Sequence, residues 1–93
     1  MIRSFRDKES ERIFLRERAK KFSQVVQRAA LRKLLLLDAA DSPEDLRVPP
    51  GNRLEKLSGD RKGQYSIRVN DQWRVCFQWR DGDAFEIEVV DYH

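Results

Sequence analysis

The clearest pattern in the chain is a run of apolar residues at helical spacing between positions 22 and 37. Successive members lie three or four positions apart, which places them on one face of an α-helix. Ser23 stands at the start of this run and has the side chain of a typical N-cap. The sequence therefore predicts a helix from Ser23 to about Ala40. We expect its buried face to hold Phe22, Val25, Val26, Ala29, Ala30, Leu34 and Leu37.

Shorter predicted elements flank this helix. Apolar and polar residues alternate from Ile2 to Phe5, which predicts a short first strand. The stretch from Asp7 to about Lys20 is rich in helix formers and predicts a first helix. Residues 42–45, Ser-Pro-Glu-Asp, are typical of a helix start, because proline fits the first turn and acids favour its positive end. We expect a short third helical turn that ends near Val48.

From residue 49 onwards the pattern is that of β-structure. Pro-Pro-Gly-Asn at 49–52 ends any helix, and strands are predicted at 53–57, 64–69, 72–80 and 84–92. Asn70-Asp71 and Asp81-Gly82-Asp83 are typical hairpin turns between the last three strands. Helices followed by an antiparallel meander indicate an α+β fold, and 93 residues are about one small domain, spanning 1–93. Alternation points Tyr65, Ile67, Val69, Trp73, Val75, Phe77, Trp79, Phe85, Ile87 and Val89 inward, and Arg74, Cys76 and Gln78 outward.

Charge is distributed unevenly along this pattern. The net charge is +3, but residues 1–40 hold eleven Lys and Arg against five Asp and Glu, whereas the rest of the chain is acidic. A basic half indicates an anionic partner such as RNA, DNA or a membrane surface. The alternative interpretation is a charged helix face that is simply solvated.

Composition excludes several classes of protein. The longest apolar run, Leu34 to Leu37, is far shorter than a membrane-spanning helix, which needs about 18 residues. The alternating N-terminus resembles neither a signal nor a transit peptide. A lone Cys76 forms no internal disulfide, and the sequence has no Cys/His cluster for a metal. We therefore expect a cytoplasmic protein without a metal or cofactor.

Two places carry candidate chemistry. Asp91, Tyr92 and His93 stand together, and an Asp beside an imidazole favours its charged form, so such a pair moves protons near neutral pH. Arg74 lies mid-strand, where its guanidinium fork suits a phosphate. The plainer alternatives are a solvated terminal histidine and a solvated outward arginine. Arg53, Lys56, Arg61 and Lys62 flank a glycine-containing loop that suits contact with a phosphate backbone.

Three motifs resemble a known family. They are Pro-Pro-Gly-Asn-Arg-Leu-Glu-Lys-Leu-Ser-Gly-Asp-Arg at 49–61, Gly-Gln-Tyr-Ser-Ile-Arg-Val-Asn-Asp-Gln-Trp-Arg-Val-Cys-Phe at 63–77 and Val-Asp-Tyr-His at 90–93. Together with Ile-Arg-Ser-Phe at 2–5, they resemble the HigB toxins of the RelE/ParE superfamily of toxin–antitoxin systems. The resemblance covers essentially the whole chain.

The resemblance implies a RelE-like fold, with N-terminal helices packed on a twisted antiparallel sheet. It implies a ribosome-dependent mRNA endoribonuclease, or mRNA interferase, that cuts the codon in the ribosomal A site. The implied partners are the ribosome with its small-subunit rRNA, the mRNA, and a helix-turn-helix antitoxin of the HigA type. Operator DNA would be contacted only through that antitoxin.

The same resemblance assigns roles to residues. Asp91, Tyr92 and His93 match the C-terminal catalytic motif, and Arg74 matches the phosphate-stabilising arginine. Glu55 stands where the family often has a catalytic histidine, so either Glu55 takes part of that role or His93 and Asp91 share it. The implied reaction is attack of a ribose 2′-hydroxyl on the adjacent phosphate. The basic residues expected to bind RNA are Arg16, Arg18, Lys20, Lys21, Arg28, Arg32, Arg53, Lys56, Arg61, Lys62 and Arg68. The alternatives are a ParE-like inhibitor of DNA gyrase and a ribosome-binding or RNA-binding module without activity.

Overall fold

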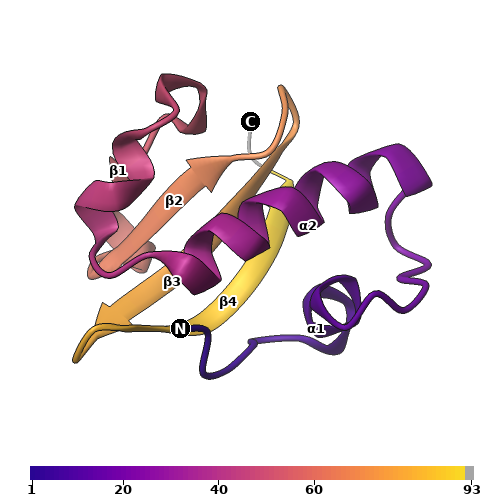
Figure 1. The fold of residues 1–93 in the computed structure, drawn as a ribbon, viewed down its shortest axis with the longest axis horizontal. Helices are drawn as coiled ribbons and strands as arrows, with labels where there is room; N and C mark the ends of the chain where they lie inside the picture. Colours follow the sequence, from indigo (N-terminus) through magenta and orange to yellow (C-terminus); the bar gives the residue numbers. More distant parts are fainter. Residues whose placement is uncertain (92–93) are drawn as a thin grey trace.

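The computed structural model describes residues 1–91, and it is an α+β fold with its helices on one face of a single antiparallel sheet (Figure 1). The sheet has four strands in the order β1-β2-β3-β4. Both α-helices pack together and against β4, and α2 also packs against β3. The elements are α1 (Lys8–Phe14), α2 (Gln24–Ala39), the 3₁₀ helices η1 (Pro43–Arg47) and η2 (Pro50–Asn52), β1 (Glu55–Lys56), η3 (Gly59–Arg61), β2 (Gln64–Arg68), β3 (Trp73–Arg80) and β4 (Asp83–Asp91).

Helix α2 confirms the strongest sequence pattern. Ser23 is its N-cap, and the Ser23 hydroxyl accepts a hydrogen bond from the Val26 amide at 3.2 Å. Its buried stripe holds Ala30, Leu34 and Leu37. The prediction that Val25 belongs to this stripe is wrong, because Val25 is 69% exposed. At 100° per residue, Val25 lies about 150°, or two fifths of a turn, away from the middle of the stripe.

Helix α1 is shorter than predicted. Asp7 caps it by accepting a hydrogen bond from the Ser10 amide at 2.7 Å, but the helix ends at Phe14 and does not continue to Lys20. Arg16 has a left-handed φ of 62°, which is incompatible with a continued helix. The residues after Phe14 favour a helix locally, but they do not continue the apolar stripe by which the helix packs against the core. Without that packing the helix is not extended.

Both hairpin turns occur, with different geometries. Asp81 and Gly82 have positive φ values of 52° and 82° and form the predicted tight turn between β3 and β4. The β2–β3 connection is longer than the predicted two-residue turn. There the Asn70 side-chain oxygen accepts hydrogen bonds from the Gln72 and Trp73 amides, both at 2.8 Å, and this holds the loop.

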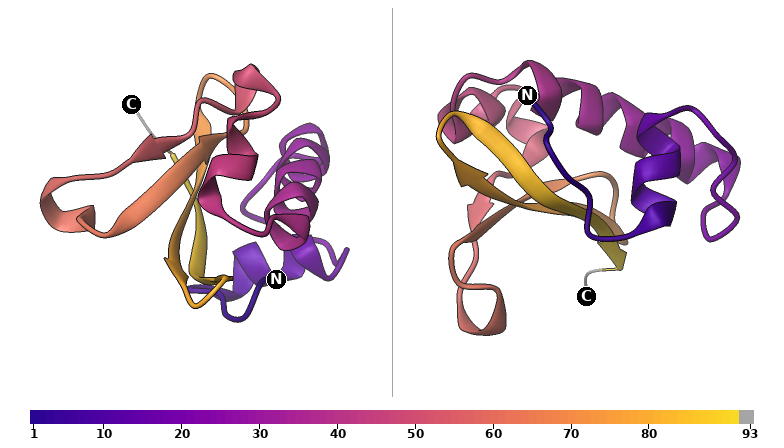
Figure 2. Two further views of the ribbon diagram at one scale, coloured as in Figure 1. Left: turned by 60° about the vertical axis from the view of Figure 1, so that its left-hand side comes forward. Right: turned by 90° about the horizontal axis from the view of Figure 1, so that it is seen from below.

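The N-terminal segment covers the outer edge of β4 (Figure 2, right). Residues 2–5 form no regular strand, contrary to prediction, but Ile2 and Phe5 pair with Ala84 and Ile87 in single parallel bridges. The Ser10 hydroxyl, from α1, accepts a hydrogen bond from the Val89 amide at 2.9 Å. This edge of the sheet is therefore occupied by the chain itself.

A bulge in β4 changes which residues face the core. The register with β3 shifts by one residue between Cys76 and Gln78, and Glu86 has a φ of 54°. As a result Ala84 and Ile87 are both buried, although they lie three positions apart. Phe85 was predicted to face the core, but it pairs with Gln78 on the other side of the sheet. There its ring lies 4.2 Å from the guanidinium carbon of Arg80.

The core lies between the helices and the sheet. It contains Ile13, Ala19, Phe22, Ala30, Leu34, Leu37, Ala40, Leu46, Ile67, Val69, Val75, Phe77, Ala84, Ile87 and Val89. None of the helices in residues 1–91 has the length and apolarity that a membrane span requires.

Candidate functional site

The sheet face turned away from the helices holds a buried arginine. Arg74 on β3 is only 7% exposed, so the alternative interpretation of a solvated arginine is wrong, and Cys76, which was also predicted to point outward, is fully buried. The Arg74 Nε donates to the Ser66 hydroxyl at 2.9 Å, and its Nη2 donates to the Arg53 carbonyl at 2.6 Å and the Ser66 carbonyl at 3.3 Å. These acceptors fix the plane of the guanidinium before any ligand arrives.

Glu55 lies beside this arginine. Its strand, β1, pairs with β2 so that Glu55 stands opposite Ser66. The Glu55 Oε1 lies 3.9 Å from the Arg74 Nη2, and the Glu55 side chain is half exposed. The structure therefore brings two of the predicted site residues together, from strands nineteen positions apart in the chain.

A surface pocket of about 330 Å³ opens at this pair. Its lining consists of Arg53, Glu55, Arg68, Asn70, Asp71 and Arg74. Arg68 forms an ion pair with Asp71. Three guanidinium groups face two carboxylates, so the lining keeps a positive charge. A rigid arginine in such a pocket suits an anionic group such as a phosphate diester. We call this cavity the Arg74 pocket.

A second pocket shares Glu55 with the first. It has a volume of about 300 Å³, and Lys56, Asp60 and Arg61 contribute to its lining. The Arg61 guanidinium also donates to Gln64 at 3.1 Å and to Glu88 at 3.2 Å, so it lies across the sheet towards β4. Lys56 and Lys62 are exposed beside it. Of the basic residues predicted around the loop, Arg53 lines the Arg74 pocket, whereas Lys56 and Arg61 line this second pocket.

Burial on this face also affects Cys76. It is fully buried, and the burial raises the pKa of its thiol above the ordinary value. A buried thiol that stays protonated is a poor nucleophile, so the chemistry of the site belongs to its charged neighbours. Among residues 1–91, no group of three or more His, Cys, Asp or Glu side chains is arranged to hold a metal ion.

Asp91, the last residue of β4, lies on the opposite face of the sheet from Arg74. The register places Asp91 opposite Trp73 and Val90 opposite Arg74. Since neighbouring side chains alternate between the two faces, the Cβ atoms of Asp91 and Arg74 lie on opposite faces of the sheet. The Asp91 Oδ2 accepts a hydrogen bond from the Gln72 Nε2 at 3.0 Å. Tyr92 and His93, the other two members of the predicted catalytic motif, lie outside the described residues.

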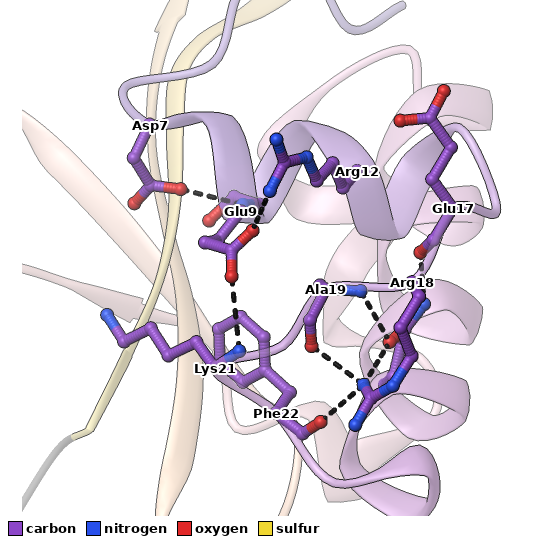
Figure 3. Close-up of polar contacts among 10 residues, drawn as sticks. Asp7, Glu9, Arg12, Glu17, Arg18, Ala19, Lys21 and Phe22 are labelled. Atoms are coloured by element: carbon purple, nitrogen blue, oxygen red, sulfur yellow. Dashed lines mark hydrogen bonds and ion pairs between the residues drawn. The ribbon is translucent and has the colours of Figure 1, made fainter.

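The basic residues predicted on the helical half lie in the other layer, away from the Arg74 pocket. Figure 3 shows that Arg18 serves the fold: its Nη1 donates to the Ala19 carbonyl at 2.7 Å and to the Phe22 carbonyl at 2.6 Å. The remaining residues of that set are exposed on the helices and their connecting segment, namely Arg16, Lys20, Lys21, Arg28 and Arg32.

Two polar residues near the site were missed in the sequence. Asn52 is fully buried, and its Oδ1 accepts a hydrogen bond from the Lys33 Nζ at 2.5 Å. Burial, followed by repulsion from Arg32 and Arg68, lowers the pKa of Lys33. Ser66 positions Arg74, as described above. The alternation of β2 placed Ser66 on the same face as Arg74, but nothing in the local sequence marked it as an acceptor.

Comparison with known proteins agrees with this fold and identifies the family of the chain. Residues 3–93 match the family described as RelE-like toxin of type II toxin–antitoxin system HigB. The chain is 47% identical over 85 residues to Toxin HigB-1 of Vibrio cholerae, covering 90% of each chain. It is 46% identical over 41 residues to Endoribonuclease HigB of Proteus vulgaris, covering 44% of this chain and 45% of that protein.

Solved structures of related fold are YoeB–YefM complexes from Staphylococcus aureus. One, titled a YoeB-YefM complex, matches with a TM-score of 0.59 and 15% identity, and covers all of this chain and 98% of that one. Another, titled a heterotetrameric YoeB-YefM toxin-antitoxin complex, matches with a TM-score of 0.63 and 16% identity at the same coverage. These likenesses support the fold, and the family match over residues 3–93 shows that the chain belongs to the HigB-like toxins of type II toxin–antitoxin systems.

Proposed function

We propose that this chain is an endoribonuclease that cuts mRNA in the A site of the ribosome and thereby stops translation. The observation that carries the proposal is the Arg74 pocket, where a buried guanidinium is held by fixed acceptors beside a half-exposed carboxylate. Cleavage of a phosphate ester requires a rigidly held cation and a group able to transfer a proton, and the pocket contains both. Its relatives named HigB support the same activity.

The reaction is attack of a ribose 2′-oxygen on the neighbouring phosphorus. The new 2′-O–P bond forms while the bond to the 5′-oxygen breaks, leaving a 2′,3′-cyclic phosphate and a 5′-hydroxyl end. Arg74 stabilises the charge that develops on the phosphate oxygens, an effect worth about 10²–10³ in rate per donor. Glu55 takes the 2′-hydroxyl proton. His93, with Asp91 two positions before it in sequence, supplies the proton to the 5′-oxygen, and Tyr92 positions the nucleotide.

The proposed partners follow from this activity and from the family. The protein acts in the cytoplasm, where its basic helical layer contacts small-subunit rRNA. An antitoxin of the helix-turn-helix HigA type neutralises it, and operator DNA is contacted by the antitoxin. The mechanism uses side chains of the protein and no cofactor.

Primer extension on mRNA from cells that express the chain tests this function. We expect new 5′ ends that appear only within translated regions and stay in register with the reading frame. Cuts spread over untranslated RNA would contradict ribosome dependence. If the mRNA stayed intact and the protein inhibited DNA supercoiling, the gyrase inhibitor would be favoured. If the mRNA stayed intact while the protein was bound to ribosomes, the binding module without activity would be favoured.

Glu55→Gln tests the proposed base. The substitution keeps the size of the side chain and removes its capacity to take a proton, so we expect cleavage of ribosome-bound mRNA to slow by about 10²-fold or more. Stability is expected to change by less than about 1 kcal/mol, because the pair with Arg74 is long and half exposed. Single-turnover cleavage and urea unfolding measure both effects.

Glu44→Gln is the matched control for this substitution. Glu44 is also an exposed acid paired with an arginine, Arg47, but it lies on η1 outside the Arg74 pocket. We expect it to cleave at the wild-type rate. If Glu55→Gln cut as fast as Glu44→Gln, Glu55 would not be the base.

A further inference from the structure

A groove of about 390 Å³ lies between the two α-helices, on the layer opposite the Arg74 pocket. Helix α1, the segment that joins it to α2, and the first half of α2 form its walls. The residues that matter to its chemistry are Ile13, Arg16, Glu17, Arg18, Arg28 and Leu31. The two cavities share no lining residue. We call this cavity the interhelical groove.

The wall formed by the connecting segment is already ordered. Arg18 donates to two carbonyls of its own segment and to the Gln27 Oε1 at 3.1 Å. The Gln27 Nε2 donates to the Glu17 carbonyl at 2.6 Å, and its Oε1 accepts from the Ala19 amide at 3.1 Å. Glu9 on α1 accepts from the Lys21 amide at 3.1 Å (Figure 3). A ligand therefore meets a prepared surface and does not have to order this loop.

Apolar side chains are exposed beside the groove. Leu15 is 56% exposed and directly precedes Arg16, while Val25 is 69% exposed and directly follows Gln24, another residue of the lining. Leu31, which is partly exposed, adds apolar surface within the groove, and Ile13 lies fully buried beneath it. Exposed apolar groups around a cavity are typical of protein–protein contacts. A nucleic-acid backbone would gain little from them, because its contacts are made by cations and polar donors.

The groove carries a net positive charge, so a partner with a negative charge is complementary to it. Its lining contains three arginines and one acid, Glu17. Arg18 is engaged in the fold, which leaves Arg16 and Arg28 as exposed cations at the groove. A protein segment that is both apolar and acidic matches this combination, because its apolar side chains cover Leu31 and the exposed Leu15 while its carboxylates meet the two arginines.

We infer that the interhelical groove binds an acidic, amphipathic segment of the antitoxin. This inference rests on the proposed function only in taking that protein as the partner. The groove shares no lining residue with the Arg74 pocket, so substitutions in the groove leave the proposed phosphate contact of Arg74 in place.

The test measures the affinity of the purified toxin variants for the full-length antitoxin encoded beside the toxin gene, by calorimetry. Arg28→Glu reverses one charge in the groove, and we expect the dissociation constant to rise at least tenfold. Arg32→Glu is the matched control, since Arg32 is an exposed arginine on the same helix, one turn further on and outside the lining. Its dissociation constant is expected to stay within about threefold of wild type. Thermal unfolding checks that both variants are folded.

A second variant tests the apolar part of the groove. Leu15→Ser removes an exposed apolar side chain without changing charge, and we expect the dissociation constant for the antitoxin to rise about threefold to tenfold. Equal weakening by Arg28→Glu and Arg32→Glu would overturn the inference. So would unchanged antitoxin affinity of Arg28→Glu combined with weaker ribosome binding, which would assign the groove to RNA. A toxin that cuts no mRNA but shows the expected affinities would overturn the proposed function and leave this inference standing.

Discussion

Arg74→Ala is expected to slow the cleavage of ribosome-bound mRNA by about 10²–10³-fold, because the cation that meets the developing phosphate charge is lost. It is also expected to lower the free energy of unfolding by about 2–4 kcal/mol. The second effect arises because Arg74 is 7% exposed, and its removal leaves the Ser66 hydroxyl and the Arg53 carbonyl without this donor. Single-turnover cleavage and urea unfolding measure the two losses separately.

A comparison of two further variants separates catalysis from stability. Arg74→Lys keeps the charge but loses the planar fork that donates to Ser66 and Arg53 together, so cleavage should stay well below wild type. Arg80→Ala is the control, since Arg80 lies on the same strand and outside the Arg74 pocket. We expect Arg80→Ala to cleave at the wild-type rate. An Arg74→Ala protein that cleaves like Arg80→Ala would show that Arg74 is purely structural.

The elements with strong periodicity could be predicted from the sequence. Helix α2 and strand β3 carry long patterns of period 3.6 and 2, and both were predicted close to their observed bounds. The end of α1 could not be predicted, because the residues after Phe14 still favour a helix locally. The helix ends because of a tertiary arrangement. The segment after it folds back so that its own Ala19 and Phe22 are buried, and hydrogen bonds of Arg18 and Gln27 hold the segment in this conformation.

Alternation alone could not predict the site. It placed Arg74 on the face opposite the core, which is correct, but that face was assumed to be open to solvent. The chain returns over it through Arg53, whose left-handed φ of 46° comes just before β1 and whose carbonyl accepts from Arg74. The bulge at Glu86 likewise exchanged the faces of Phe85 and its neighbours. Both features depend on strand register, which a local pattern does not contain.

The two candidate sites lie on different layers of the molecule. The Arg74 pocket lies on the free face of the sheet, and the interhelical groove and the exposed basic residues lie on the helical layer. An anionic polymer or an acidic protein segment that meets the helical layer leaves the sheet face accessible. The proposed recognition surface and the proposed site of cleavage therefore lie on different faces of the 93-residue chain.

His93→Ala is expected to reduce cleavage by about 10²–10⁴-fold, the range that positioned proton transfer contributes. Arg74, Glu55 and Asp91 remain in this variant, so the phosphate contact and the proposed base are unchanged. Within residues 1–91 the core lies between positions 13 and 89, and we expect the melting temperature of this variant to stay within about 2 °C of wild type. Single-turnover cleavage and thermal unfolding measure the two quantities.

The pH dependence of cleavage assigns the role of this histidine. An ordinary imidazole titrates near pH 6.5, so a general acid at this position makes the wild-type rate fall as the pH rises through its pKa. His93→Ala should lose that fall while keeping its folded state. Tyr92→Phe keeps the aromatic ring and the histidine, and it should retain the fall even where its rate is lower. If His93→Ala cut mRNA at the wild-type rate with the same pH profile, the proton on the 5′-oxygen would come from another group, such as Asp91 or Glu55.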